Sequence, residues 1–345
     1  DDKFGYNYNI FVNKARAYGL YEMNYGKLNY RLSAFVEGTT MEREGLMQNG
    51  RAPENSYGKS GQAKFLGGGG RFGLTYRPTG AHILSLNFGA ESDAPLARNS
   101  FVAPRMQNNF VDNLTNEQIF NAEASYQFRI GDFSGKVTGY YTRFNNGVEQ
   151  TAFYNDQEER FTYLTMSGVD REHYGVEAAL KYNLTSNFSV SLTGTYAEAQ
   201  YVNNPLAQVA YEGMNASTLK TLNTWKNPVT GQQMPLCVVA DGMRVNGTPL
   251  TAISLGLNYN VNGWFFEANL NYYDRVYVDF SEYRRLGNVL PYYVSEGFDD
   301  KGNYLFQNVN ADDLAKGAVL YDAQDGHIVS AYSAEQEKFD GGFML

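Results

Sequence analysis

The stretch that decides the fold is YGVEAALKYNLTSNFSVSLTGTY, residues 174–196. Every second residue from Tyr174 to Tyr182 is apolar or aromatic, and the same pattern returns from Phe188 to Tyr196. The positions in between are small or polar. Because successive side chains of a strand point to opposite faces, this pattern predicts a hairpin with one apolar and one polar face.

Each apolar face of this hairpin begins and ends on an aromatic residue, eight positions apart. A strand rises about 3.3 Å per residue, so a strand tilted by roughly 40° climbs about 20 Å over that interval. The apolar band between the two aromatic girdles of an outer-membrane barrel is about 25 Å tall. The spacing therefore predicts strands that cross a membrane.

The same spacing recurs in other parts of the chain. Aromatic residues stand at both ends of five apolar faces: Phe120/Phe128, Phe133/Tyr141, Tyr174/Tyr182, Phe188/Tyr196 and Trp264/Tyr272. None of these faces carries a charge, whereas the opposite faces carry Glu123, Lys136, Glu177, Lys181 and Glu267. A soluble sandwich would concentrate its aromatics in the middle of its core. We therefore predict an all-β, antiparallel transmembrane barrel with these five charged residues lining its lumen.

The composition of the chain excludes several classes of protein and of site. No run approaches the roughly 18 apolar residues of a membrane helix, so a closed barrel is the membrane fold that fits. The net charge of −9 argues against nucleic acid as a partner, because phosphate binding needs a basic surface. Cys237 is the single cysteine, which excludes an intrachain disulfide and a cysteine-based metal cluster. No cofactor is expected.

About ten strands are expected from the alternation. Short turns near residues 26, 79, 131, 185 and 261 alternate with longer connections, as periplasmic turns alternate with extracellular loops. We expect one strand over 65–77 to be interrupted by the glycines 67–70, a loop from about 46 to 62, and irregular chain over 279–337. Phe339 to Leu345 has the pattern of a further strand.

The ends of the chain suggest a piece of a larger barrel. The expected first and last strands both have their free ends on the outer side, and no apolar leader follows Asp1-Asp2-Lys3. We interpret the sequence as the middle of a bigger barrel, either processed or a fragment.

Two long loops are the candidate ligand-binding segments, since loops on a rigid scaffold commonly carry recognition. Their aromatic, amide and basic side chains can stack on and hydrogen-bond to a sugar, peptide or chelate. The candidates are Arg98, Arg105, Asn108 and Asn109 in residues 92–116, and Tyr211, Trp225 and Arg244 in residues 202–247.

Other groupings do not predict chemistry. Alternation places Asp170 and Glu172 on the face of Tyr174 and His173 on the opposite face, so they cannot converge on one ion, and a solvated strand extension is expected. His82 and His327 lie far apart in the sequence without supporting metal ligands. No nucleophile motif or phosphate-binding glycine loop is present. The sequence predicts no catalytic residue and no metal site.

Several short motifs resemble one family in order and spacing. Asn113-Leu114-Thr115-Asn116-Glu117 followed by residues 122–128, AEASYQF, resembles a strand entry of TonB-dependent outer-membrane receptors. Gly175-Val176-Glu177-Ala178 is similar to another strand of these barrels. The segments GTPL at 247–250 and YDRVY at 273–277 are similar to later ones.

The resemblance implies a larger barrel, of 22 strands, to which residues 1–345 contribute one part without the N-terminal plug domain and the final strands. It implies uptake of a scarce ligand (a siderophore, vitamin, glycan or peptide) with energy from TonB. The implied partners are outer-membrane lipid, the plug domain, the TonB complex and the ligand. Two alternatives from other classes are a passive porin of about 12 to 14 strands and a soluble all-β binding or adhesion protein.

Overall fold

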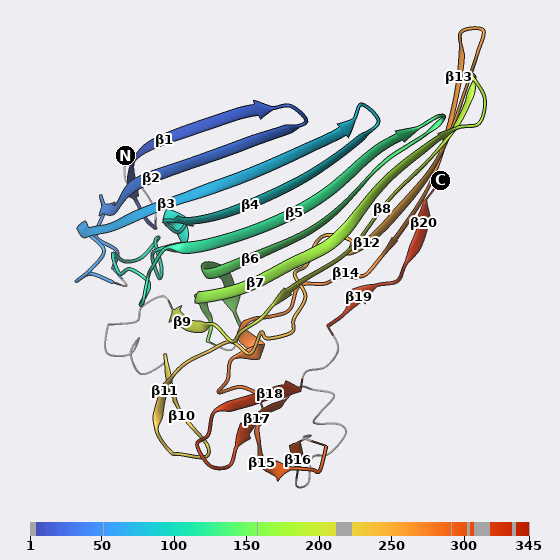
Figure 1. The fold of residues 1–345 in the computed structure, drawn as a ribbon. Helices are drawn as coiled ribbons and strands as arrows, with labels where there is room; N and C mark the ends of the chain where they lie inside the picture. The colour runs from blue at the N-terminus through green and yellow to red at the C-terminus, as the bar shows by residue number, and fades with distance from the viewer. Residues whose placement is uncertain are drawn as a thin grey trace.

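The computed structural model describes residues 5–50, 52–156, 158–211, 223–290, 292–301, 304–306, 318–332 and 336–344. One large antiparallel sheet dominates it, with the strand order β1-β2-β3-β4-β5-β6-β7-β8-β12-β13-β20 and with β9 paired to the outer part of β7. The sheet is curved into an open wall (Figure 1). Neighbouring strands are consecutive hairpin partners over most of this order, which is the topology of an up-and-down barrel.

The strands of the wall are long. Their bounds are β1 Tyr8–Tyr25, β2 Leu28–Gly45, β3 Gly58–Thr79, β4 His82–Asp93, β5 Glu117–Ile130, β6 Phe133–Asn155, β7 Arg160–Asn183, β8 Phe188–Tyr201, β12 Thr251–Val261, β13 Trp264–Asp274 and β20 Gly342–Met344. The short turns β1–β2, β3–β4, β5–β6, β7–β8 and β12–β13 all lie at one end of the wall, and the other connections lie at the opposite end (Figure 1). β2–β3, β4–β5 and β8–β12 are joined by the predicted longer connections. The β6–β7 connection, residues 156–159, was also expected to be long, but it is as short as the β7–β8 turn.

The register confirms which residues share a face. Leu192 of β8 lies between Leu180 of β7 and Leu255 of β12. Leu180 and Leu192 belong to the predicted apolar faces, and the register places Leu255 beside them. Leu192 is 43% exposed and Leu255 38% exposed, although both are apolar. Apolar side chains in a row on an open face are what a lipid-facing wall requires.

Both aromatic rows continue across neighbouring strands. Tyr141 of β6 stacks with Tyr174 of β7, with ring centroids 6.4 Å apart, at the outer end. At the end with the short turns, Phe133 packs edge-on against Tyr182 at 6.3 Å. The rows therefore form two bands on one face of the sheet, as predicted from the spacing.

Two details predicted for β3 are wrong. β3 begins at Gly58, so the connecting loop is shorter than expected, and the strand runs unbroken through the glycines 67–70. The first residues of β3 stand beyond the apolar band, where both faces are polar, and alternation therefore carries no signal there. β2 ends at Gly45, where the loop was expected to begin.

The segment 279–337 was expected to be irregular, but its described part contains a four-stranded sheet in the order β16-β15-β17-β18. The strands are β15 Tyr292–Phe298, β16 Tyr304–Phe306, β17 Ala318–Asp322 and β18 Ile328–Tyr332. β15 and β17 are parallel, a pairing between segments far apart in the sequence. The predicted final strand is confirmed by β20, which pairs with β13, and by β19 Lys338–Phe339, which pairs with β14 Val276–Tyr277.

The long loops fold into a structure with its own apolar core. One cluster packs the outer part of β7 (Leu164, Met166) against β9 Leu206–Tyr211 and residues 236–243. A second cluster packs residues 102–111 against Tyr163 and Ala210. The small hairpin β10 Thr224–Lys226 and β11 Gln233–Pro235 also belongs to this region. No described helix is long and apolar enough to cross a membrane.

Candidate functional site

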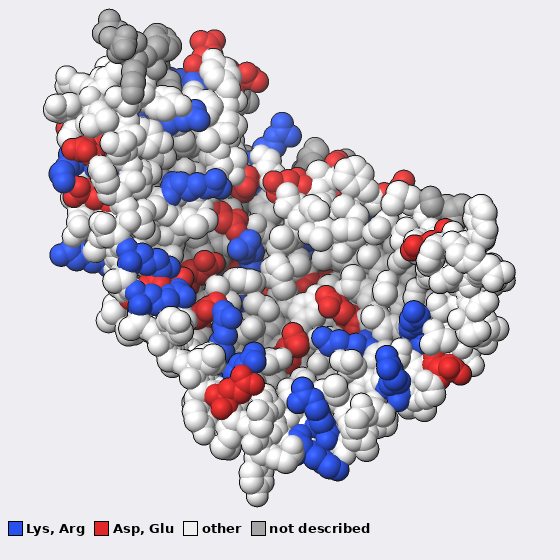
Figure 2. Space-filling view, turned by 90° about the horizontal axis from the view of Figure 1, so that it is seen from above, with Lys and Arg blue, Asp and Glu red and all other residues white. Residues whose placement is uncertain are grey.

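The face of the wall opposite the aromatic rows is polar. It carries the five predicted lumen residues: Glu123, Lys136, Glu177, Lys181 and Glu267. Glu123 accepts a hydrogen bond from the Asn87 amide at 3.3 Å. Figure 2 shows a hollowed face of the molecule on which basic and acidic side chains are interspersed. Their role in lining a passage stays a prediction.

Ion pairs organise this face near the outer ends of β1 and β2. Glu37 is almost fully buried and lies 2.5 Å from both Lys14 Nζ and Arg16 Nε. Asp93 of β4 also pairs with Lys14, at 3.2 Å. A buried carboxylate needs such compensation, since an unpaired buried charge is costly. The cluster ties three strands together through their polar side chains.

Residues 94–116 are folded against the wall, and Arg43 of β2 anchors them. The Arg43 side chain is 2% exposed. Its Nε donates to the carbonyl oxygen of Pro104 at 2.8 Å, and its Nη1 donates to the carbonyl of Ser56 at 3.2 Å and to the Asn108 side chain. Its guanidinium also lies over the Tyr8 ring, 4.8 Å from the centroid. One buried arginine thus joins β1, β2, the β2–β3 loop and the β4–β5 loop.

The four ligand candidates in this loop are placed differently. Arg98 and Arg105 are exposed, and Arg105 lies over the rings of Tyr6 and Phe161, 5.1 and 5.8 Å from their centroids. Asn108 is buried against Arg43, and Asn109 accepts a hydrogen bond from Asn55 at 2.5 Å. Only the two arginines stand at the surface.

The candidates in the second loop lie within the packed region. Tyr211 is 7% exposed, and its hydroxyl is 2.9 Å from that of Tyr283. Trp225 is partly buried and packs against Tyr321 with ring centroids 5.9 Å apart. Arg244 pairs with Glu198 at 3.4 Å. The structure does not bring these three together with Arg98 or Arg105 in one pocket among those described, and ligand binding by the seven candidates stays a prediction.

A cleft that the sequence did not indicate lies between the tip of the β6–β7 hairpin and residues 281–289. It has a volume of about 890 Å³ and is lined by Thr151, Phe153, Tyr154, Asn155, Asp156, Ser281, Glu282, Tyr283, Arg284 and Val289. Phe153 and Tyr283 meet edge-on with centroids 5.4 Å apart. Glu282 accepts a hydrogen bond from Thr151 Oγ1 at 3.0 Å, and burial raises the pKa of its carboxyl.

This cleft combines aromatic faces with charged and amide groups. Tyr154 is 59% exposed, so part of its ring is available to a ligand. Its residues come from two segments about 130 positions apart, and neither has a sequence motif. The adjacent aromatic residues Phe153 and Tyr154, at the outer end of β6, were the one local signal that could have directed attention to it.

Above the outer aromatic row, ion pairs replace the solvated extension that was expected. Arg143 of β6 lies 3.5 Å from Asp170 and 3.8 Å from Glu172. As predicted, His173 lies on the other face, where it packs edge-on against Phe144 with centroids 5.3 Å apart. The carboxylates are therefore neutralised by a neighbouring strand instead of by water alone.

Arg275, in the YDRVY segment, forms a second group of ion pairs and hydrogen bonds near the outer aromatic row. It lies 2.5 Å from Glu198 and donates to the carbonyl oxygens of Ala197 and Leu250 at 2.7 and 3.0 Å. Its guanidinium stands over the Tyr196 ring, 4.2 Å from the centroid. The planar fork of arginine suits this set of acceptors. The motif noted in the sequence therefore fastens the end of β13 to β8.

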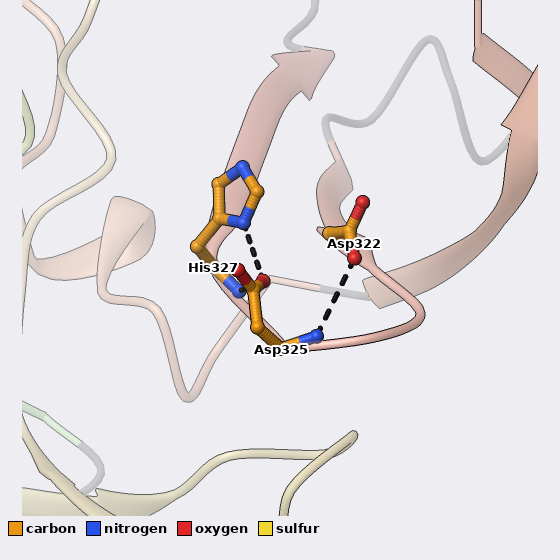
Figure 3. Close-up of side chains that lie close together, drawn as sticks. All are labelled: Asp322, Asp325 and His327. Carbon is orange, nitrogen blue, oxygen red and sulfur yellow. Dashed lines mark hydrogen bonds and ion pairs between the residues drawn. The ribbon is translucent and has the colours of Figure 1, made fainter.

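One group of potential metal ligands occurs among the described residues. Asp322, Asp325 and His327 each offer an atom within 4.8 Å of the others (Figure 3). The two aspartates also stabilise the turn between β17 and β18. The Asp322 carboxylate accepts a hydrogen bond from the backbone N–H of Gln324 at 2.7 Å, and the Asp325 carboxylate accepts one from the backbone N–H of His327 at 3.0 Å. The adjacent Asp325 raises the pKa of His327. The sequence pattern had not connected His327 with these two aspartates.

The apolar face bounded by two aromatic rows, the polar opposite face and the folded outer loops together define the wall of an outer-membrane β-barrel. The family model described as "TonB dependent receptor-like, beta-barrel" matches residues 2–312. The chain belongs to this family of receptors and transporters of the Gram-negative outer membrane. The predicted resemblance, fold class and localisation are confirmed.

Solved structures agree on the fold. The chain is similar to the copper transporter OprC, with a TM-score of 0.54 and 14% identity over 82% of this chain. It is similar to the siderophore receptor PiuA from Acinetobacter baumannii, with a TM-score of 0.51 and 15% identity over 79% of this chain. It spans 37% and 34% of these two proteins. No curated protein matches the sequence.

Proposed function

We propose that the full-length protein takes up a scarce ligand of the siderophore, vitamin, glycan or peptide class with energy supplied through TonB. The family supports a receptor or transporter of the outer membrane. The observation that supports ligand capture is the folded cap of outer loops, with its aromatic and charged cleft, at the end of the wall opposite the short turns. The family assignment favours this function over a passive porin or a soluble binding protein.

The proposal assigns separate tasks to separate regions. The cleft around Tyr154 and Tyr283, together with the exposed Arg98 and Arg105, would contact the ligand first. The polar face with Glu123, Lys136, Glu177, Lys181 and Glu267 would line the passage. We further propose that residues 1–345 are part of one barrel domain, whose plug and remaining strands belong to the rest of the full-length protein. The chain's share of its solved relatives supports this division.

Growth or uptake assays on the intact receptor test the proposal. Cells that depend on the receptor are supplied with candidate ligands, with and without an active TonB system. We expect uptake that requires both the receptor and TonB. Uptake that is unchanged after loss of TonB would contradict energy coupling and would favour a passive channel.

The cleft is tested by a matched pair of substitutions. Tyr154→Ala removes an exposed ring from the cleft, whereas Tyr57→Ala removes an exposed ring from the β2–β3 loop. We expect a weaker apparent ligand affinity for Tyr154→Ala alone, with equal amounts of receptor in the membrane. Equal affinities for the two variants would exclude the cleft as the capture site.

A further inference from the structure

We propose that Arg129, Lys136 and Lys181 form an anion-binding site on the polar face of the wall, at the end with the short turns. The site would take a carboxylate or phosphate group. It lies far along the wall from the cap and is separate from the capture cleft. The inference needs the inward orientation of this face but does not depend on the identity of the ligand that the receptor carries.

The register brings the three cations together. Arg129 of β5 pairs with Ser134 of β6, which pairs with Lys181 of β7, so the three residues form one row across the sheet. Lys136 is two positions from Ser134 on the same face of β6. With strands about 4.8 Å apart, the Cα atoms of Arg129 and Lys181 are separated by about 10 Å. The long side chains can therefore reach one group between them.

These residues line a cleft that is rich in donors and has no acid in its lining. The cleft has a volume of about 690 Å³, and its polar lining is Gln127, Arg129, Ser134, Lys136, Lys181, Ser191 and Thr193. Three like charges in one recess repel one another unless an anion is supplied. A recess lined by one sign of charge also concentrates ions of the opposite sign.

Several basic side chains further along this face are neutralised. Arg31 lies 3.3 Å from Glu22, Arg71 lies 3.1 Å from Glu91, and Lys14 and Arg16 share Glu37. Among the residues that the structure describes, no ion pair is found for the three cations of this cleft. Glu177 lines a neighbouring cleft with Lys136, and Asp132 and Glu267 line another with Lys181, but none of these acids forms an ion pair with the three cations. The cations are therefore free to share an anion as their counter-charge.

Two sources could supply that group. One is a carboxylate elsewhere in the same full-length chain, and the other is a free anion or an anionic ligand in the lumen. Both use the same chemistry, which is charge-assisted hydrogen bonding from ammonium and guanidinium groups. Lysine reactivity distinguishes them, because an ammonium group held by an anion loses its proton less readily and reacts more slowly with acylating reagents.

The experiment uses the full-length receptor in detergent. Lysines are acetylated to low extent, and the rate at each lysine is followed by mass spectrometry with and without inorganic phosphate. Lys27, in the exposed β1–β2 turn outside the cleft, is the reference. We expect Lys136 and Lys181 to react severalfold more slowly than Lys27. Slow reaction without phosphate identifies a carboxylate of the same chain, and slow reaction only with phosphate identifies a free anion.

Substitution of Arg129 shows whether the lysines are protected from acetylation by a bound anion or by burial. Arg129→Gln should raise the acetylation rates of Lys136 and Lys181, whereas Arg129→Lys should leave them low. Heat-modifiable mobility on gels confirms that each variant is folded. Equal rates at all three lysines with and without phosphate would overturn the proposal, as would protection that Arg129→Gln leaves unchanged. Loss of uptake plays no part in this readout, so the proposed transport function can fail independently.

Discussion

A charge placed on Leu192 tests the assignment of the membrane-facing side. Leu192 lies in β8 four residues from Phe188 and four from Tyr196, which mark the two aromatic rows. Leu180 and Leu255 flank it on the neighbouring strands, and its side chain is 43% exposed. In a membrane-spanning wall this exposed surface faces lipid. Leu192→Arg therefore places a guanidinium among acyl chains.

The geometry sets the expected magnitude. Four residues of a strand tilted by roughly 40° climb about 10 Å, so Leu192 lies close to the middle of the apolar band. Arginine on the lipid face costs about 2–4 kcal/mol at the midplane and about 0–1 kcal/mol near the interfaces. We expect the free energy of unfolding to fall by the larger amount.

The measurement is urea unfolding of the full-length receptor in lipid vesicles, followed by tryptophan fluorescence and gel mobility. Thr195→Arg is the matched control, because Thr195 is on the polar face and pairs with Glu177 of β7. We expect little change for the control. If both variants lost the same stability, or if neither did, the assignment of the two faces would be refuted.

Three further predictions follow from single side chains outside the apolar band. Arg43→Met should leave buried acceptors without a donor, at about 1–3 kcal/mol each, and should expose residues 94–116 to limited proteolysis; an unchanged cleavage pattern would contradict its anchoring role. Arg275→Lys keeps the charge but loses the planar fork, so the unfolding free energy should fall by about 1–3 kcal/mol; full stability would show that charge alone suffices. His327 should titrate above its ordinary value of 6.5, because Asp325 stabilises its protonated form. This contribution is present below the unfolded pKa and disappears as pH rises through the folded one; histidine NMR should show the midpoint return toward 6.5 in Asp325→Asn.

Much of the wall could be predicted from sequence because a membrane imposes two simple rules. Side chains alternate between lipid and lumen, and aromatics collect at the two interfaces. The hairpin of residues 174–196 follows both rules, and its register in β7 and β8 agrees with the prediction. The five charged residues lie on the face opposite the aromatic rows for the same reason, and their role in lining a lumen stays a prediction.

The prediction failed where those rules stop. β3 begins beyond the apolar band, with polar residues on both faces, so no pattern marked its true start. The sheet of β15, β16, β17 and β18 is built from strands of three to seven residues, and β15 pairs with β17 across 27 positions, Tyr292 with Val319. Strands this short leave no local period that identifies them or their partners.

The sequence alone determined the class of fold, the two faces of the wall and the end at which the loops lie. Tertiary structure decided which loop residues are buried anchors and which are exposed, as the contrast between Asn108 and Arg105 illustrates. It also decided that Phe153 meets Tyr283 in one cleft and that Arg129, Lys136 and Lys181 share another. Alternation is a local consequence of strand geometry and can be read from neighbouring residues. The composition of a site depends on which distant segments the fold brings together, and that information is distributed over the whole chain.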